Sequence, residues 1–348
     1  MVRISSLVCL VLLVTIGVMV SVSLADNNEE KSTDLKKVKG GVTDRSISKK
    51  TLGVHELKKG NLTAKFTNRG ASIMSLLFPN KNGKIEDIVL GYDSVNDYMN
   101  DTVFCGVTLA RVANKREKTV VNDGKHGVTK ESGDVIWTVK KHNNNGKKPY
   151  IVFRYTSPDG DHQGKLEVTV TYKLVGDNKL KMVMEAKAKE KATPVNLVHR
   201  SYWNLGGHNN EDILSEEIQI LGSGYAHLDH NLTPTGKILA VKGTPYDFRQ
   251  LRPIKDNINE LKTGKVVELV DKKSKIKMEL STDQSGLKFY TGGRLKKNKN
   301  GSVHKAYSGL CLESHAINNQ YRPSQIVEPG KNYKHTMLFK FSIVPSTL

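Results

Sequence analysis

The chain has 348 residues, of which 26% are charged, and a formal net charge of +19 at pH 7. Three cysteines are too few for a disulfide scaffold, so a hydrophobic core must hold the fold, and a chain of this length can bury one. The lysines are dispersed over turn-like segments without interleaved aromatic residues, which argues against a nucleic-acid-binding protein and favours a solvated basic surface with weak adhesion to acidic glycans.

The first 25 residues have the order of a secretory signal. Arg3 precedes an apolar run over residues 7–22, and small residues end at Ala25. The run approaches the length of a membrane-spanning helix, so a cleaved signal peptide and an uncleaved anchor, with a membrane tether over residues 7–25, both stay open. Because acidic residues follow the run, the rest of the chain is expected in the secretory pathway, in the endoplasmic reticulum lumen or outside the cell.

Residues 26–50 are polar and charged with few large apolar side chains, which predicts a disordered linker. From residue 51 onward, short alternating or apolar runs recur, separated by turn sequences such as NKNGK, SPDGD and VGDNK. Helical periodicity is scarce. Residues 51–348 are therefore predicted to form one all-β domain, a large antiparallel β-sandwich. The sequence contains no glycine-rich phosphate loop and no Cys/His metal spacing.

Two features bear on the secretory expectation. Glycosylation sequons occur at four asparagines, which a lumenal chain can have modified: Asn61, Asn100, Asn231 and Asn300. Outside the signal, Cys105 and Cys311 are the two cysteines. Both a bridge between them and two buried thiols are open, and the thiols are favoured.

Glu313 is the residue whose position most indicates chemistry. It ends the apolar run GLCLE, and a carboxylate that finishes a buried strand costs free energy unless a partner offsets its charge. Burial is also expected to raise its pKa. In VNLVHRSYWNLGGH, His199 alternates with Arg200, so their side chains are expected on opposite faces of a strand, with Trp203 on the side of His199.

Other polar residues have ordinary structural explanations beside functional ones. Arg111 follows an apolar run and suits a surface position at a strand end, and His126 lies in a glycine-flanked loop. Asp247 can close an Asx turn or pair with Arg249 or Arg252. By themselves these residues name no reaction.

Six longer motifs follow one another along the chain: LTAKFTNRGASIMSLLFPNKNGKIEDIVLGYDSVNDYMND, GVTLARVANK, NLVHRSYWNLGGHNNEDILSEEIQI, LTPTGKILAVKGTPYDFR, SGLCLESHAIN and PSQIVEPGKNYKHTMLFKFS. In order and spacing, over nearly all of residues 51–348, they resemble the aldose 1-epimerases, or galactose mutarotases. The resemblance implies the large antiparallel β-sandwich of that family and a reaction that needs neither cofactor nor metal, the interconversion of the α and β anomers of a free aldose.

The resemblance also implies roles for individual residues. Opening a pyranose ring requires a base that takes the proton of the anomeric hydroxyl and an acid that protonates the ring oxygen. Glu313 matches the family's base and His199 its acid, which an ordinary histidine pKa of about 6.5 suits. Arg111, His126 and Asp247 match the groups that position the sugar by hydrogen bonds.

Two other functions compete with a mutarotase for galactose, glucose or a related aldose. Glu313 and His199 favour the enzyme. Three features favour a non-catalytic protein, either a sugar- or glycan-binding module or a membrane-tethered trafficking factor. These are the N-terminal segment, the basic surface, and loops around His126 and after Glu313 that are shorter than in the family. A hexose phosphate mutarotase ranks last, because it requires a cluster of arginines at the pocket.

Overall fold

The computed structural model describes residues 51–345 except 102, 112–134, 146, 159–163, 211, 229–233, 257–263, 294, 296–303 and 317–324. The expected signal or anchor over 1–25 and the expected linker over 26–50 lie outside the described residues, as do His126, Asn231 and Asn300. Within the described ranges, the search for a helix long and apolar enough to cross a membrane finds none.

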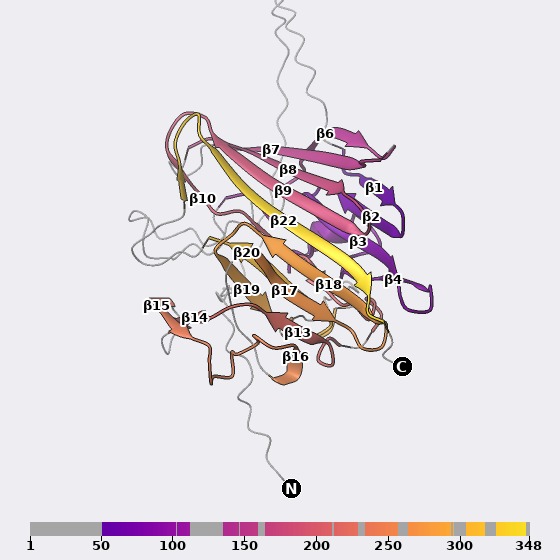
Figure 1. Ribbon diagram of the computed structural model, residues 1–348. Helices are drawn as coiled ribbons and strands as arrows, with labels where there is room; N and C mark the ends of the chain where they lie inside the picture. Colours follow the sequence, from indigo (N-terminus) through magenta and orange to yellow (C-terminus); the bar gives the residue numbers. More distant parts are fainter. Residues whose placement is uncertain are drawn as a thin grey trace, which may run out of the picture.

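The largest element is a nine-stranded antiparallel sheet, which faces the viewer in Figure 1. Its strands, in spatial order, are β16 (Arg252–Pro253), β13 (Glu217–Ile220), β17 (Gly264–Val270), β18 (Ile276–Thr282), β22 (Asn332–Ile343), β9 (Lys179–Ala188), β8 (Leu166–Leu174), β7 (Tyr150–Ser157) and β6 (Thr138–Asn143). Buried and less buried residues alternate along β8 and β9, as expected for strands with one face on a core.

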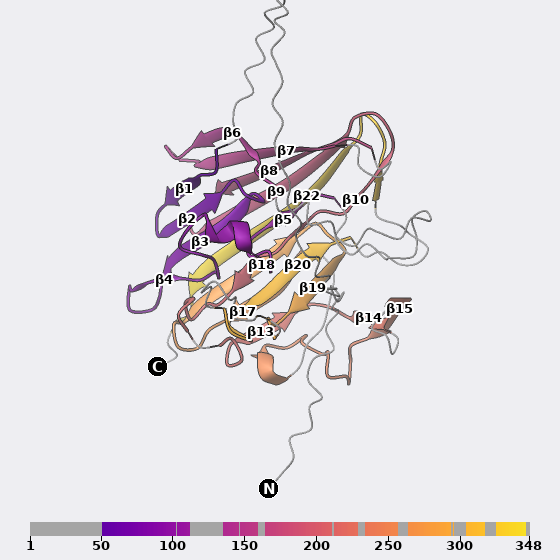
Figure 2. The same cartoon turned by 180° about the vertical axis from the view of Figure 1, so that it is seen from behind.

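A four-stranded and a three-stranded sheet complete the main architecture (Figure 2). The first contains β1 (Val54–Lys59), β2 (Leu62–Thr67), β3 (Ser72–Pro79) and β4 (Ile85–Asp87), and the second contains β12 (Tyr202–Trp203), β20 (Leu310–His315) and β19 (Gly286–Tyr290). The short pairs are β11 (Val198–His199) with β5 (Thr108–Leu109), β10 (Thr193–Val195) with β21 (Gln325–Val327), and β14 (Gly224–Leu228) with β15 (Pro234–Ala240). Two 3-10 turns are described, η1 (Asp97–Asn100) and η2 (Ile254–Asp256).

One hydrophobic core joins the sheets, and aromatic side chains mark the contacts between them. The rings of Phe66 in β2 and Tyr172 in β8 lie 4.6 Å apart. Trp203 in β12 packs 4.9 Å from Phe339 in β22. The expected all-β antiparallel architecture is confirmed, and residues of the nine-, four- and three-stranded sheets share one apolar core.

Strand β22 offers a direct test of this packing. Phe339→Ala should lower the free energy of unfolding by about 3–5 kcal/mol, because it leaves a cavity beneath Trp203. The matched control is Leu338→Ala on the other face of the same strand, where the expected loss is below about 1 kcal/mol. Equal losses for the two variants in urea denaturation would contradict this assignment of inner and outer faces.

Candidate active site

The strand pair β12–β20 carries the chemically distinctive residues. Tyr202 pairs with Cys311, and their side chains therefore share one face of this sheet. Glu313, two residues farther along β20, projects from the same face, and Lys288 of β19 is its direct cross-strand neighbour. We call Arg200, Tyr202, Lys288, Cys311 and Glu313 the Glu313 cluster.

Glu313 is a buried carboxylate between two cations. Its side chain is 3% exposed, with Arg200 Nε 3.2 Å from Oε1 and Lys288 Nζ 3.3 Å from Oε2. Burial raises the pKa of Glu313, but the charges of Lys288 and Arg200 outweigh burial and hold that pKa below its ordinary value. The expectation of a raised pKa is therefore wrong, because it considered burial without these partners. At neutral pH the carboxylate is ionised and can accept a proton.

A tight loop holds Arg200 in this position. The Gly106 N–H donates to the Arg200 carbonyl at 2.9 Å, and the Arg200 N–H donates to the Val107 carbonyl at 3.0 Å. Gly106 has a φ of +70°, and a Cβ there would lie 2.2 Å from the carbonyl oxygen of Ile73. A residue with a side chain at position 106 would therefore displace the backbone that positions Arg200.

Beside the carboxylate lies an apolar wall that contains both cysteines. Cys105 and Cys311 are buried in one cluster with Leu90, Tyr202 and Tyr290. Both thiols are free, in agreement with the favoured expectation of two buried thiols rather than a bridge. Burial raises the pKa of each thiol, which makes both of them weak nucleophiles.

His199 projects away from the Glu313 cluster. Its Nδ1 lies 3.3 Å from Thr108 Oγ1 and its Nε2 lies 2.7 Å from Ser201 Oγ. Its ring also packs edge-on against Tyr172 in the main core. Burial, followed by the proximity of His335, lowers the pKa of His199 to about 3. The structure thus pairs Glu313 with Arg200, and it directs His199 to the opposite face, as the alternation of neighbouring residues requires.

The residues expected to position a sugar have structural partners. The Arg111 guanidinium donates to Ser157 Oγ at 2.7 Å and to the carbonyls of Pro158 and Gly164 at 2.5 and 2.8 Å, so it fastens the end of β7. Asp247 accepts two hydrogen bonds from the Arg249 guanidinium, at 2.8 and 2.6 Å.

This pairing with Arg249 lowers the pKa of Asp247 to about 2. Their described contacts bring neither Arg111 nor Asp247 to Glu313.

Nothing in the sequence singles out Lys288, and Arg200 is expected only on the strand face opposite to that of His199. The alternation that separates positions 199 and 200 is readable in the sequence, but the register that puts Lys288 opposite Glu313 is not. Among the described residues, no group of three or more His, Cys, Asp or Glu side chains is arranged to hold a metal ion. The Glu313 cluster is suited to proton transfer, because it contains a buried, ionised carboxylate beside a lysine ammonium.

Comparison with known proteins gives a consistent result. The family model described as aldose 1-epimerase matches residues 53–340. The galactose mutarotase of Sus scrofa is 31% identical over 331 residues, covering 84% of this chain and 95% of its own. That of Homo sapiens is 32% identical with the same coverage. The crystal structure of an aldose epimerase homologue from C. elegans superimposes with a TM-score of 0.73 at 24% identity, over 85% of this chain and 100% of its own, which shows a shared fold.

The buried histidines predict an acid-sensitive fold. Burial lowers the pKa of His199 to about 3 and that of His335 to about 4, so both are neutral in the folded chain and gain protons when it unfolds. The contribution of the two neutral histidines to the free energy of unfolding is fully present above pH ~6.5 and is lost as the pH falls towards their pKa values in the folded chain. Between pH ~6.5 and ~5, each should remove roughly 2 kcal/mol of unfolding free energy, measured by urea denaturation. His199→Gln should remove its own share, roughly 2 kcal/mol, from this pH dependence of the unfolding free energy, and an unchanged dependence in the variant would contradict the assignment.

Proposed function

The chain belongs to the aldose 1-epimerase family, and we propose that it interconverts the α and β anomers of a free aldose, such as galactose or glucose, by proton transfer at Glu313. The family match over residues 53–340 and the galactose mutarotases at 31% and 32% identity support the activity. The observation that carries the site is the buried Glu313 carboxylate, ionised between Arg200 and Lys288.

Glu313 acts as the base of the ring opening. It takes the proton of the anomeric hydroxyl, the electron pair of that O–H bond forms the carbonyl, and the bond between C1 and the ring oxygen breaks. The ring oxygen receives a proton from an acid, which gives the open-chain aldehyde. Rotation about the C1–C2 bond and reversal of both proton transfers close the ring as the other anomer. An ionised carboxylate is the form this step requires.

Lys288 is the proton donor in this proposal. General acid catalysis requires a donor within hydrogen-bond reach of the ring oxygen, and this oxygen and the anomeric hydroxyl share one carbon. The Lys288 ammonium lies 3.3 Å from Glu313 Oε2, so a sugar that reaches the base also reaches the ammonium. Arg200 keeps the carboxylate oriented and ionised, and is a positioning residue.

The family resemblance assigns the donor role to His199 instead. Both ring nitrogens of His199 have partners in the core, and its pKa of about 3 leaves it neutral at pH 7, which argues for a packing role. The contacts of Arg111 and Asp247 argue for structural roles in the same way. For His126, which lies outside the described residues, a role in holding a sugar hydroxyl stays a prediction.

Polarimetry of freshly dissolved α-galactose and α-glucose with the full chain in non-ionic detergent tests these assignments. Glu313→Gln should lower kcat/KM by about 100-fold or more, because it removes the base. Lys288→Gln should cause a loss of similar order, whereas His199→Gln in a folded protein should change the rate by less than about threefold. Lys288→Gln should also move the acidic limb of any remaining activity to higher pH, because loss of the ammonium raises the pKa of Glu313.

The matched variants separate the alternatives. If His199→Gln abolishes activity while Lys288→Gln retains it, the histidine is the donor and the lysine assignment is wrong. If the wild-type chain and all variants match the buffer rate, the catalytic proposal fails for these sugars. Calorimetry with both anomers then tests the chain as a sugar-binding protein.

We also propose that the domain acts inside the secretory pathway. The order of Arg3, an apolar run and acidic residues supports this route, and the sequon asparagine Asn61 is exposed in the turn between β1 and β2. The full chain expressed in a eukaryotic cell should be protected from protease in intact microsomes, and peptide N-glycosidase should increase its electrophoretic mobility. Asn61→Gln should reduce that shift. Digestion in intact microsomes together with an unchanged mobility would contradict the route.

A further inference from the structure

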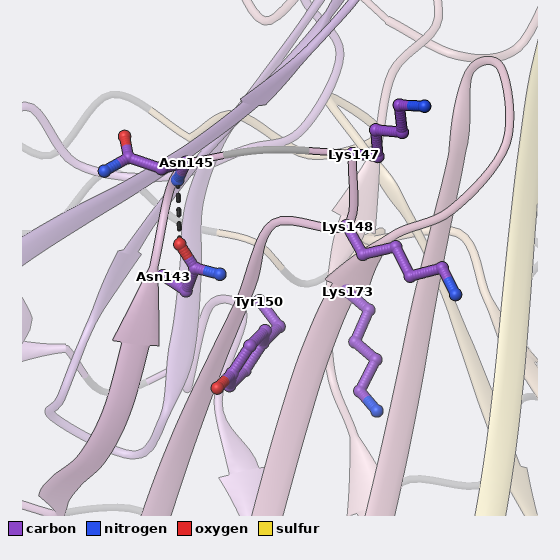
Figure 3. Close-up of a pocket in the computed structure, with 6 residues that line it drawn as sticks. All are labelled: Asn143, Asn145, Lys147, Lys148, Tyr150 and Lys173. Atoms are coloured by element: carbon purple, nitrogen blue, oxygen red, sulfur yellow. Dashed lines mark hydrogen bonds between the residues drawn. The ribbon is translucent and has the colours of Figure 1, made fainter.

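A hollow lies at the β6–β7 hairpin, in a different sheet from Glu313. It has a volume of about 530 Å³ (Figure 3), and it is lined by Asn143, Asn145, Lys147, Lys148, Tyr150 and Lys173. We call it the β6–β7 hollow. Figure 1 places this end of the large sheet far from β19 and β20. The sugar chemistry proposed at Glu313 makes no use of these residues.

Strand register builds one side of the hollow. Asn143 of β6 pairs with Tyr150 of β7, Tyr150 pairs with Lys173 of β8, and Lys173 pairs with Lys181 of β9. Directly paired residues project from the same face of a sheet, so an amide, a phenol ring and two ammonium groups form one row. The neighbouring Tyr172 is buried in the core, so this row lies on the outer face of the sheet.

Contacts from β1 fasten the hairpin loop that forms the other side. Lys59 Nζ donates to the Lys147 carbonyl at 2.7 Å, and the Lys58 N–H donates to Asn144 Oδ1 at 2.8 Å. Within the loop, the Asn145 N–H donates to Asn143 Oδ1 at 2.9 Å, the bond drawn in Figure 3. These bonds tie described residues of the loop to β1 and β6, and Lys147 and Lys148 line the hollow together with the row.

Among the residues that the structure describes, no carboxylate balances the positive charge of the hollow. Its lining contains three lysines and no carboxylate. Two other lysines of the large sheet do have acidic partners, Lys340 with Glu279 and Lys277 with Glu268. Among the ion pairs of the described residues, none includes Lys147, Lys148 or Lys173. A concave site with one sign of charge attracts the opposite charge.

We propose that the β6–β7 hollow is a binding site for acidic oligosaccharide, a sugar chain that carries carboxylate or sulfate groups. The ammonium groups of Lys147, Lys148 and Lys173 pair with the anionic groups. The ring of Tyr150 offers an apolar body for the C–H face of a pyranose, and its hydroxyl is a polar contact. The side-chain amides of Asn143 and Asn145 donate to and accept from sugar hydroxyls.

A nucleic acid fits this surface less well. Proteins that bind single strands combine a basic groove with several aromatic side chains on which successive bases stack. The hollow has one aromatic residue, Tyr150, together with two amides that match hydroxyl groups. Such a site would hold the domain near an acidic glycan without blocking the Glu313 cluster, because the two lie in different sheets.

Fluorescence anisotropy with a labelled oligogalacturonate and the full chain in non-ionic detergent tests the proposal. The variant K147Q/K148Q/K173Q should bind about tenfold more weakly or worse, because three ion pairs are lost together. Tyr150→Ala should weaken binding about threefold or more, because it removes the stacking surface. Both variants should keep the wild-type mutarotation rate, and the affinity of the wild type should fall as salt is added.

The matched control removes three exposed lysines that do not line the hollow, in K242Q/K255Q/K305Q. The control should bind within about twofold of the wild type. An equal loss in the control would show that net charge alone attracts the ligand, and would overturn the site. Equally tight binding of neutral dextran oligomers would overturn the ion pairs. Equal binding of single-stranded DNA, unaffected by Tyr150→Ala, would identify a general polyanion surface instead.

Discussion

The buried ion pairs of Glu313 are the interaction on which the site depends. Transfer of an isolated carboxylate into a protein interior is costly, and such a group normally becomes protonated. Here two cations approach its two oxygens, at 3.2 and 3.3 Å, and the carboxylate stays ionised although it is buried. Removing one partner of a buried pair leaves an uncompensated charge, so Arg200, Lys288 and Glu313 form a unit. The close backbone approach at Gly106 and the register of β19 with β20 both serve to hold that unit.

Alternation along the strands divides the molecule into two chemical environments. The face of β20 that carries Cys311 and Glu313 meets Arg200, Tyr202 and Lys288, whereas its other face packs into the main core. On that core side, His335 Nε2 lies 2.7 Å from Ser314 Oγ, and burial keeps the ring neutral. His199 shares that environment. Adjacent residues of one motif therefore lie in different chemical environments, because a shift of one position along a strand exchanges the faces.

Lysines in this protein differ by what surrounds them. Lys288 is half of a buried pair, and Lys277 and Lys340 balance glutamates on the outer face of the large sheet. In the β6–β7 hollow, Lys147, Lys148 and Lys173 gather around Tyr150 without a carboxylate in the lining. In a chain with a net charge of +19, some lysines are therefore balanced by a neighbouring carboxylate and others are not. The proposed glycan site uses one local concentration of lysines whose described neighbours include no acidic partner.

The sequence by itself determined the fold class, and it singled out Glu313 as a candidate for chemistry. Period-two alternation is a local property that indicates strands, and a carboxylate at the end of GLCLE is unusual wherever that strand packs. The buried free thiols could also be expected from two cysteines. Tertiary structure decided the partners. The register of β19 with β20 places Lys288 beside Glu313, and the side chains of Arg111 and Asp247 bond to Ser157 and Arg249. Tertiary structure also reversed the direction of the Glu313 pKa shift, because electrostatic interactions depend on distances between residues far apart in the chain, and only folding sets those distances.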